Sequence, residues 1–268
     1  MEYFKCNPSL CYGASCCRNQ FIKPVTSLGD LLRLSKHTGR SPSEIWEQDG
    51  EVALVPTEKR GEFESFAALK VPCPFLKDNK CTVYSSRPFG CAVFPLEAIF
   101  EGKKELELYD KGEFRCLNGT TLSPKDAEVL EKMRYVMKKE VKIEIPLFPW
   151  TQERTIDATT NIKVHNLIKA AVEKQQKVDA TASTERSKHL ISSAGRLNQI
   201  IREKQGVQMD DFRALIEPIA DILHRDIIKR IITSLTPEQI ARYDNTSARY
   251  LELIGELASN NSPCQHNP

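Results

Sequence analysis

Long hydrophobic runs are missing from this sequence. Its apolar residues occur in short groups, far below the roughly 20 consecutive apolar residues that a membrane-spanning helix needs. The first residues also lack a basic stretch followed by an apolar one, which is the pattern of a secretory signal peptide. We therefore expect a cytoplasmic protein without a membrane-bound part.

An excess of charge of one sign is missing as well. The chain has 38 Lys and Arg residues against 36 Asp and Glu residues, which gives a formal net charge of +2. Domains that bind nucleic acids usually carry a pronounced basic excess. The charge balance therefore gives no indication of a nucleic-acid partner.

The sequence also lacks the common signatures of several enzyme classes. It has no G-x-G-x-x-G motif for a dinucleotide and no G-x-S-x-G motif for a serine nucleophile. The C-x3-C-x2-C spacing of radical enzymes is absent too. No catalytic residue can be assigned on this basis, although a metal-dependent enzyme need not contain any of these motifs.

Cysteine, in contrast, is abundant and unevenly distributed. Eight of the nine cysteines precede residue 117, and only Cys264 lies in the tail. A cytoplasmic environment keeps most thiols reduced, so clustered cysteines there are more often metal ligands than disulfides. The eight candidate ligands are Cys6, Cys11, Cys16, Cys17, Cys73, Cys81, Cys91 and Cys116.

The donor atoms at such a centre are expected to be sulfur alone, because His37 is the only histidine in the first half of the chain. Four thiolates fit either a tetrahedral zinc ion or an iron–sulfur cluster. Eight thiols would suffice for two such centres, or for one centre with spare thiols. The adjacent Cys16 and Cys17 are awkward ligands for one zinc ion, because neighbouring side chains are expected to diverge. The pair could instead serve two centres, or place one thiol outward as a reactive group. Buried free thiols and disulfides remain alternatives.

One stretch resembles a known family. It runs from Cys73-Pro-Phe-Leu through Cys81-Thr-Val-Tyr84, Arg87-Pro88 and Cys91-Ala-Val-Phe94-Pro95. These landmarks, with an upstream Cys-Cys pair and a Leu-rich helix, resemble the YkgJ cysteine-cluster family over roughly residues 1–120. Two features differ from the family pattern: the first cysteines have x4 spacings, and Ala92 stands where an arginine is usual.

The resemblance implies zinc or iron chelation, and in many members an iron–sulfur cluster such as 4Fe-4S. Arg87 is the residue that we expect to contact the cofactor, either its sulfur atoms or an anionic substrate group. Flagellin lysine N-methylases carry a related module. The resemblance therefore also implies a possible S-adenosylmethionine-dependent protein lysine N-methylase.

The expected fold class is an α+β cysteine-rich metal-binding domain followed by an all-α helical domain. The boundaries are placed at residues 1–150 and 151–259, with a disordered tail over residues 260–268. Periodicity predicts helices that start near residues 27, 42 and 124, and later helices over 161–178, 184–204, 209–234 and 237–258. Strands are expected over 51–56, 63–70, 92–100 and 105–109.

Three functions are open at this point. The first is a metal-binding module with a redox or sensing role. The second is an enzyme, with lysine N-methylation as the concrete example. The third is a structural zinc domain that presents a helical interaction module to a protein partner.

Overall fold

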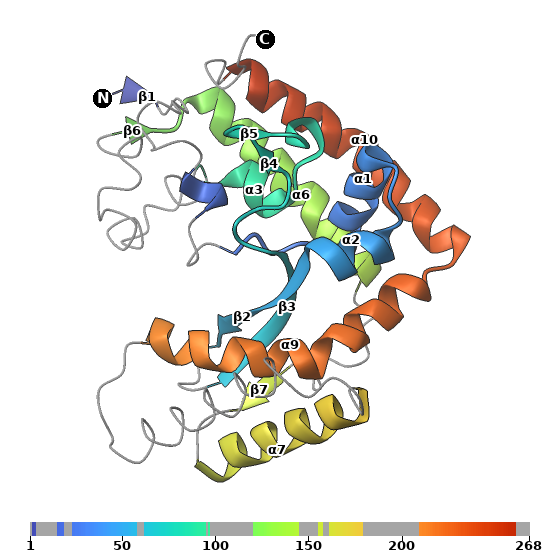
Figure 1. Ribbon diagram of the computed structural model, residues 1–268. Helices are drawn as coiled ribbons and strands as arrows, with labels where there is room; N and C mark the ends of the chain where they lie inside the picture. The colour runs from blue at the N-terminus through green and yellow to red at the C-terminus, as the bar shows by residue number, and fades with distance from the viewer. Residues whose placement is uncertain are drawn as a thin grey trace. The chain divides into compact units, whose positions relative to one another are not determined.

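The computed structural model describes residues 2–3, 15–18, 23–57, 62–94, 96, 120–144, 155–157, 161–178 and 209–260 (Figure 1). Within these ranges, none of the helices combines the length and the apolar composition that crossing a bilayer requires. The chain forms two compact units. Unit 1 consists of Met1–Asp49, Leu69–Leu147 and Leu235–Pro268, and unit 2 of Gly50–Ala68 and Phe148–Ser234.

In unit 1, helix α1 (Leu28–Thr38) is delimited by its caps. The Ser27 hydroxyl accepts a hydrogen bond from the amide of Asp30, whose carboxylate accepts one from the Ser27 amide. This capping box satisfies two amides of the first turn. At the other end, Gly39 has a φ of 73°, a left-handed conformation that glycine adopts with little strain. All residues from Leu28 to Leu34 are buried, so this half of the helix lies in the core.

Helix α2 (Pro42–Asp49) follows directly and begins in the same way. The amide of Glu44 donates to the Ser41 hydroxyl at 3.2 Å, and the Ser41 amide donates to the Glu44 carboxylate at 2.7 Å. The side chains of Ile45 and Trp46 are fully buried. The first 49 residues of the chain thus supply part of the core of unit 1.

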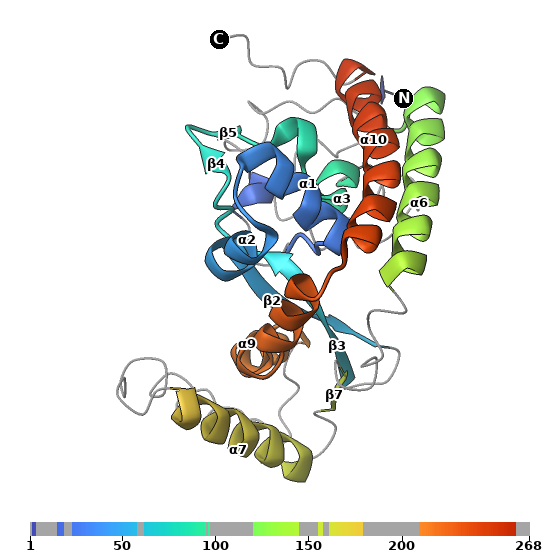
Figure 2. The ribbon, with the colours of Figure 1, turned by 90° about the vertical axis from the view of Figure 1, so that its right-hand side faces the viewer.

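Two long helices, α6 (Pro124–Glu144) and α10 (Pro237–Asn260), lie side by side in unit 1 (Figures 1 and 2). Their apolar residues recur at helical spacing and meet in one buried cluster. The cluster also receives residues from the short helix α3 (Phe89–Val93). Its members are Ala92, Val93, Leu96, Val129, Leu130, Met133, Val136, Tyr250, Leu253, Ile254 and Leu257.

The remaining elements of unit 1 are short. Strand β1 (Glu2–Tyr3) pairs in parallel with β6 (Thr120–Thr121). Strands β4 (Leu76–Lys77) and β5 (Lys80–Cys81) form an antiparallel hairpin. Two 3-10 turns, η1 (Ser15–Cys17) and η2 (Tyr84–Ser86), complete the described part.

Unit 2 contains a three-stranded sheet in the order β2 (Gly50–Pro56), β3 (Glu62–Leu69) and β7 (Thr155–Asp157). Helix α9 (Met209–Thr233) packs on β2, and α7 (Asn161–Val178) packs on α9. The fully buried side chains of Phe63 and Ile156 come from paired positions of β3 and β7.

Helix α9 also covers the backbone of β2, which is an edge strand. Four residues of a helix span about 6 Å along its axis, and two residues of a strand span about 6.6 Å. Side chains four residues apart on α9 can therefore form hydrogen bonds with every second residue of β2. Arg225 donates to the Gly50 carbonyl at 2.9 Å, and the Val52 and Leu54 amides donate to Asp221 and Glu217 at 3.0 and 3.4 Å. Polar groups that would otherwise be open to another chain are thereby occupied.

Most of the predicted elements in the described ranges are confirmed, including the mixed N-terminal part and the mostly helical C-terminal part. Strand β7 interrupts the part expected to be wholly helical. The strand predicted over 92–100 is wrong at its start, because Ala92 and Val93 belong to helix α3. Pro218 lies inside α9 without ending it. The elements expected over 105–109 and 184–204, and the tail after 260, lie outside the described residues. The domain division at residue 150 stays a prediction.

Candidate metal centre

The structure describes five of the eight candidate ligands: Cys16, Cys17, Cys73, Cys81 and Cys91. They come from four separate segments of unit 1, namely η1, the turn before β4, strand β5 and helix α3. All five are free thiols. Cys16 is exposed and the others are half-buried, so the group lies close to the surface of the unit. The other three candidates, Cys6, Cys11 and Cys116, lie outside the described residues.

The β4–β5 hairpin determines where Cys81 lies. Its two-residue turn, Asp78 and Asn79, has positive φ angles of 49° and 60°. This turn geometry matches the twist of paired strands, and Asp and Asn tolerate it better than most residues. In the register of this hairpin, Cys81 lies opposite Leu76. The Arg18 guanidinium donates to the Asn79 side chain, which connects the hairpin tip to the residue that follows the Cys16-Cys17 pair.

Cys73 is joined to the same pair through the backbone. Its amide donates to the Cys17 carbonyl at 2.8 Å. The sulfur atoms of Cys16 and Cys17 lie 3.9 Å apart. The expectation that these neighbouring side chains diverge is therefore wrong.

The pKa values of these thiols reflect their mutual proximity. Hydrogen bonding among the thiols of Cys16, Cys17 and Cys73 raises the pKa of Cys17 and lowers the pKa of Cys16. For the same reason the pKa of Cys73 falls to about 7.

Burial raises the pKa of both Cys81 and Cys91, and the negative charges of Cys73 and Cys16 raise them further. All five thiols thus interact electrostatically, and negative charge on one opposes ionisation of the next. A bound metal cation would offset this repulsion between thiolates and so favour their ionisation, which metal ligation requires.

Cys91 is positioned by helix α3, which approaches the chain before α1 very closely. A Cβ atom on Gly90 would lie 3.3 Å from the Val25 carbonyl oxygen, so a side chain larger than hydrogen would crowd this contact. The amide of Phe89 donates to the Asp30 carboxylate at 3.0 Å. An acidic group from α1 thus caps the start of the helix that carries Cys91.

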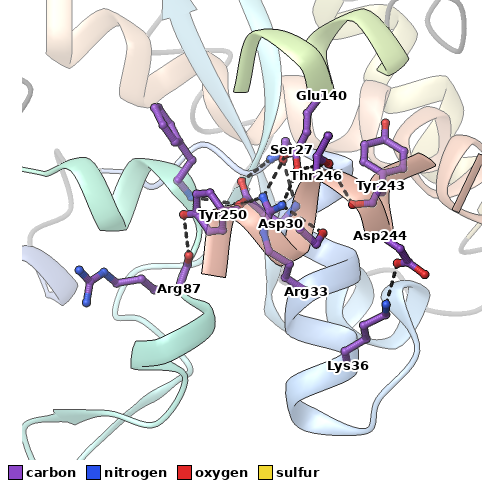
Figure 3. A network of polar contacts seen from close by, with 12 residues as sticks. Ser27, Asp30, Arg33, Lys36, Arg87, Glu140, Tyr243, Asp244, Thr246 and Tyr250 are labelled. Atoms are coloured by element: carbon purple, nitrogen blue, oxygen red, sulfur yellow. Dashed lines mark hydrogen bonds and ion pairs between the residues drawn. The ribbon is translucent and has the colours of Figure 1, made fainter. Parts of the chain in front are cut away.

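Asp30 belongs to a buried polar network (Figure 3), and its charge raises the pKa of Cys91. At its centre, the Arg33 guanidinium contacts Asp30 at 2.6 Å and forms two bonds with the Glu140 carboxylate. It also stacks on the ring of Tyr250, 4.0 Å from the centroid. Burial lowers the pKa of Arg33, but the charges of Asp30 and Glu140 more than offset this and raise it above its ordinary value.

The network joins helices α1, α6 and α10 to the residues before Cys91. Glu140 accepts hydrogen bonds from Thr246 at 3.0 Å and from Ser27 at 3.4 Å. The Tyr250 hydroxyl donates to the Arg87 carbonyl at 3.0 Å. No motif in the sequence points to Glu140, Thr246 or Tyr250. The available signal was a charged residue at an apolar helix position, as Glu140 continues the buried stripe of α6.

Arg87 provides the clearest test of whether the site fits a metal centre. Its Nε and Nη1 atoms are buried and have no hydrogen-bond partner in the described structure. Unpaired buried N–H groups cost about 1–3 kcal/mol each. Its positive charge lowers the pKa of Cys81, so the guanidinium lies within electrostatic reach of the thiols. Sulfur-only donors beside unpaired N–H groups fit a thiolate-bound metal centre, at which sulfur atoms accept such hydrogen bonds.

The described part of the chain does not by itself form a closed ligand set. Among its residues, no three Cys, His, Asp or Glu side chains are arranged so that they could hold one metal ion. The thiols are near one another, but their assignment as ligands stays a prediction.

A comparison with protein families matches residues 5–117 to the model CxxCxxCC, described as a putative zinc- or iron-chelating domain. The match includes all eight candidate cysteines and Arg87. No match was found among the curated proteins or among the solved structures. The resemblance noted in the sequence is thereby confirmed for the N-terminal region. Residues 5–117 of this chain match the cysteine-cluster domain of the YkgJ type.

Proposed function

We propose that the cysteine-rich part of unit 1 binds an iron–sulfur cluster and that this cluster gives the protein a redox role. The observation that carries the proposal is the contact of Cys16, Cys17 and Cys73, together with the effect of the Cys16 and Cys73 charges on Cys81 and Cys91. Cys73, Cys81 and Cys91 are the central ligands in this proposal. The fourth comes from Cys16 or Cys17, and Cys6, Cys11 and Cys116 are further candidates from the sequence.

One feature favours a cluster over a single zinc ion. A cluster contributes sulfide atoms of its own, which are acceptors for buried N–H donors such as those of Arg87.

Zinc is the second candidate, and one distance favours it. Thiolates bound tetrahedrally at about 2.3 Å lie roughly 3.8 Å apart. The sulfur atoms of Cys16 and Cys17 are 3.9 Å apart, as two ligands of one tetrahedral ion would be. In that case the centre is structural and has no redox activity.

The two candidates separate in one experiment. The full-length protein, purified without oxygen, is analysed for iron, zinc and acid-labile sulfide, and its visible spectrum is recorded before and after dithionite. Iron with equimolar sulfide and an absorption band that bleaches reversibly supports the proposal. Zinc without sulfide supports the structural site. Iron without sulfide contradicts the cluster, and a band that does not respond to reductant contradicts the redox role.

A further inference from the structure

The main chain at Arg87 and just after it forms hydrogen bonds with side chains of two other helices. Its carbonyl accepts from the Tyr250 hydroxyl of α10 at 3.0 Å. Two residues later, the amide of Phe89 donates to Asp30 of α1 at 3.0 Å. Pro88, between them, has a fixed φ of −54°. The backbone that carries Arg87 is therefore rigidly connected to the helices of unit 1.

The side chain of Arg87 is directed by a second contact. Its guanidinium lies over the ring of Tyr84, 3.9 Å from the centroid, which is a favourable cation–π distance. Figure 3 shows this side chain extending away from the buried network around Arg33. Unlike Arg33, whose charge is matched by Asp30 and Glu140, Arg87 forms no salt bridge within the described residues.

The Arg87 guanidinium is thus a positive group with two buried N–H donors that lack an acceptor in the described part of the protein. In the chain, Arg87 lies between Cys81 of β5 and Cys91 of α3. An acceptor that is negatively charged and arrives with the metal would satisfy both donors.

We infer that Arg87 is a positioning residue for the metal centre and donates Nε–H and Nη1–H to sulfur atoms of the bound cluster. This inference rests on the proposed function. The donors stabilise negative charge on the cluster sulfurs, and they do so more strongly when the cluster is reduced. Arg87 therefore increases the affinity for the cluster and raises its reduction potential.

The test compares the wild-type protein with the variants R87Q and R87K, and with R249Q as the matched control. Gln removes the charge, whereas Lys keeps the charge but loses the planar pair of donors. Arg249 is an exposed arginine of α10 that pairs with Glu252 at the surface of the same unit. Each protein is reconstituted with iron and sulfide. Cluster retention under a competing chelator and the reduction potential are then measured.

We expect R87Q to weaken cluster retention by about 10–100-fold and to shift the potential to more negative values. R87K should recover part of each effect, and R249Q should equal the wild type. The metal-free R87Q protein should be destabilised less than the loaded R87Q protein, because without the cluster the two donors have no partner and only the contact with Tyr84 is lost.

Three results would overturn the inference. If R87Q retains the cluster as well as the wild type and has the same reduction potential, the inference about Arg87 is wrong, while the proposed function stands. Full recovery by R87K shows that charge alone acts and the directed donors do not. An equal loss of stability in metal-free and loaded R87Q shows a purely structural role. A wild-type protein that takes up no cluster instead refutes the proposed function itself, and this inference with it.

Discussion

The Tyr250 hydroxyl of helix α10 donates a hydrogen bond to the carbonyl oxygen of Arg87, 163 residues away in the sequence. Tyr250 is fully buried, and its ring also lies under the Arg33 guanidinium. One side chain from the C-terminal helix thus contacts both the buried ionic network and the segment that leads to Cys91. The cysteine-rich region therefore depends on a helix that lies outside the family match over residues 5–117.

Removing this hydroxyl should destabilise unit 1. In Y250F the ring remains, but the buried Arg87 carbonyl loses its donor, so we expect unfolding to become easier by about 1–3 kcal/mol. Urea unfolding measures this difference. Y135F is the matched control, because Tyr135 on α6 is 61% exposed. Equal stability of the two variants would show that the Tyr250 bond contributes nothing.

Helix α1 approaches α6 so closely that Gly29 has no room for a side chain. A Cβ atom there would lie 2.4 Å from the Glu140 carboxylate. An alanine in a helix interior normally stabilises by up to about 1 kcal/mol relative to glycine. We expect the opposite for G29A, a loss of about 1–3 kcal/mol from overpacking.

Gly255 in α10 provides the control for this substitution, because a Cβ atom at that position meets nothing within 4 Å. Thermal unfolding should therefore show a raised midpoint for G255A and a lowered one for G29A. A rise in both would contradict the close packing of α1 against Glu140.

The Arg33–Glu140 pair should be far more important than a surface ion pair. Its two side chains are 1% and 0% exposed, so E140Q leaves Arg33 with less compensation in the core. Breaking a buried pair costs about 3–5 kcal/mol. The Lys36–Asp244 pair is 59% and 44% exposed, and D244N should cost at most about 1 kcal/mol. Similar denaturant midpoints for the two variants would contradict this ranking.

Unit 2 should become less stable as the pH is lowered, because it contains one buried histidine. His224 is 6% exposed, and its Nδ1 atom lies 2.7 Å from the Ser65 hydroxyl. Burial, with a contribution from Lys174, lowers the pKa of His224 to about 4, from 6.5 when unperturbed. Above pH 6.5 both folded and unfolded chains keep the residue neutral. Between pH 6.5 and 4 only the unfolded chain takes up the proton, so stability is lost as pH falls.

The shift corresponds to a loss of up to roughly 3 kcal/mol across this window. H224Q cannot take up the proton, so its unfolding free energy should depend less on pH there. Denaturant unfolding of both proteins at pH 7, 5.5 and 4 measures the difference. Parallel pH profiles for the wild type and H224Q would contradict a buried neutral histidine.

Local signals in the sequence were enough to predict many elements. The helix start near residue 27 could be predicted, because a cap acts within one turn of the backbone. Cysteine spacing and the residues around Arg87 were sufficient for the family resemblance. The helix containing Ala92 was mistaken for a strand, because an amide at its start is capped by Asp30, 59 residues away.

The polar network was beyond the reach of local patterns for the same reason. Arg33 and Glu140 are 107 residues apart, and neither has a motif that points to the other. The short distance between the Cys16 and Cys17 sulfur atoms is likewise not revealed by the cysteine spacing. These contacts could not be predicted from composition or from the periodicity of apolar residues.

The most direct test of the central claim is the metal content of the C73S variant beside that of C264S and the wild type, all purified in full length without oxygen. Cys73 shares its hydrogen bonds and its electrostatic field with the other described thiols, whereas Cys264 lies in the tail. We predict that C264S keeps the wild-type content of iron and sulfide and that C73S loses most of both. Equal metal content in all three proteins, or none in the wild type, would contradict a metal centre built on these cysteines.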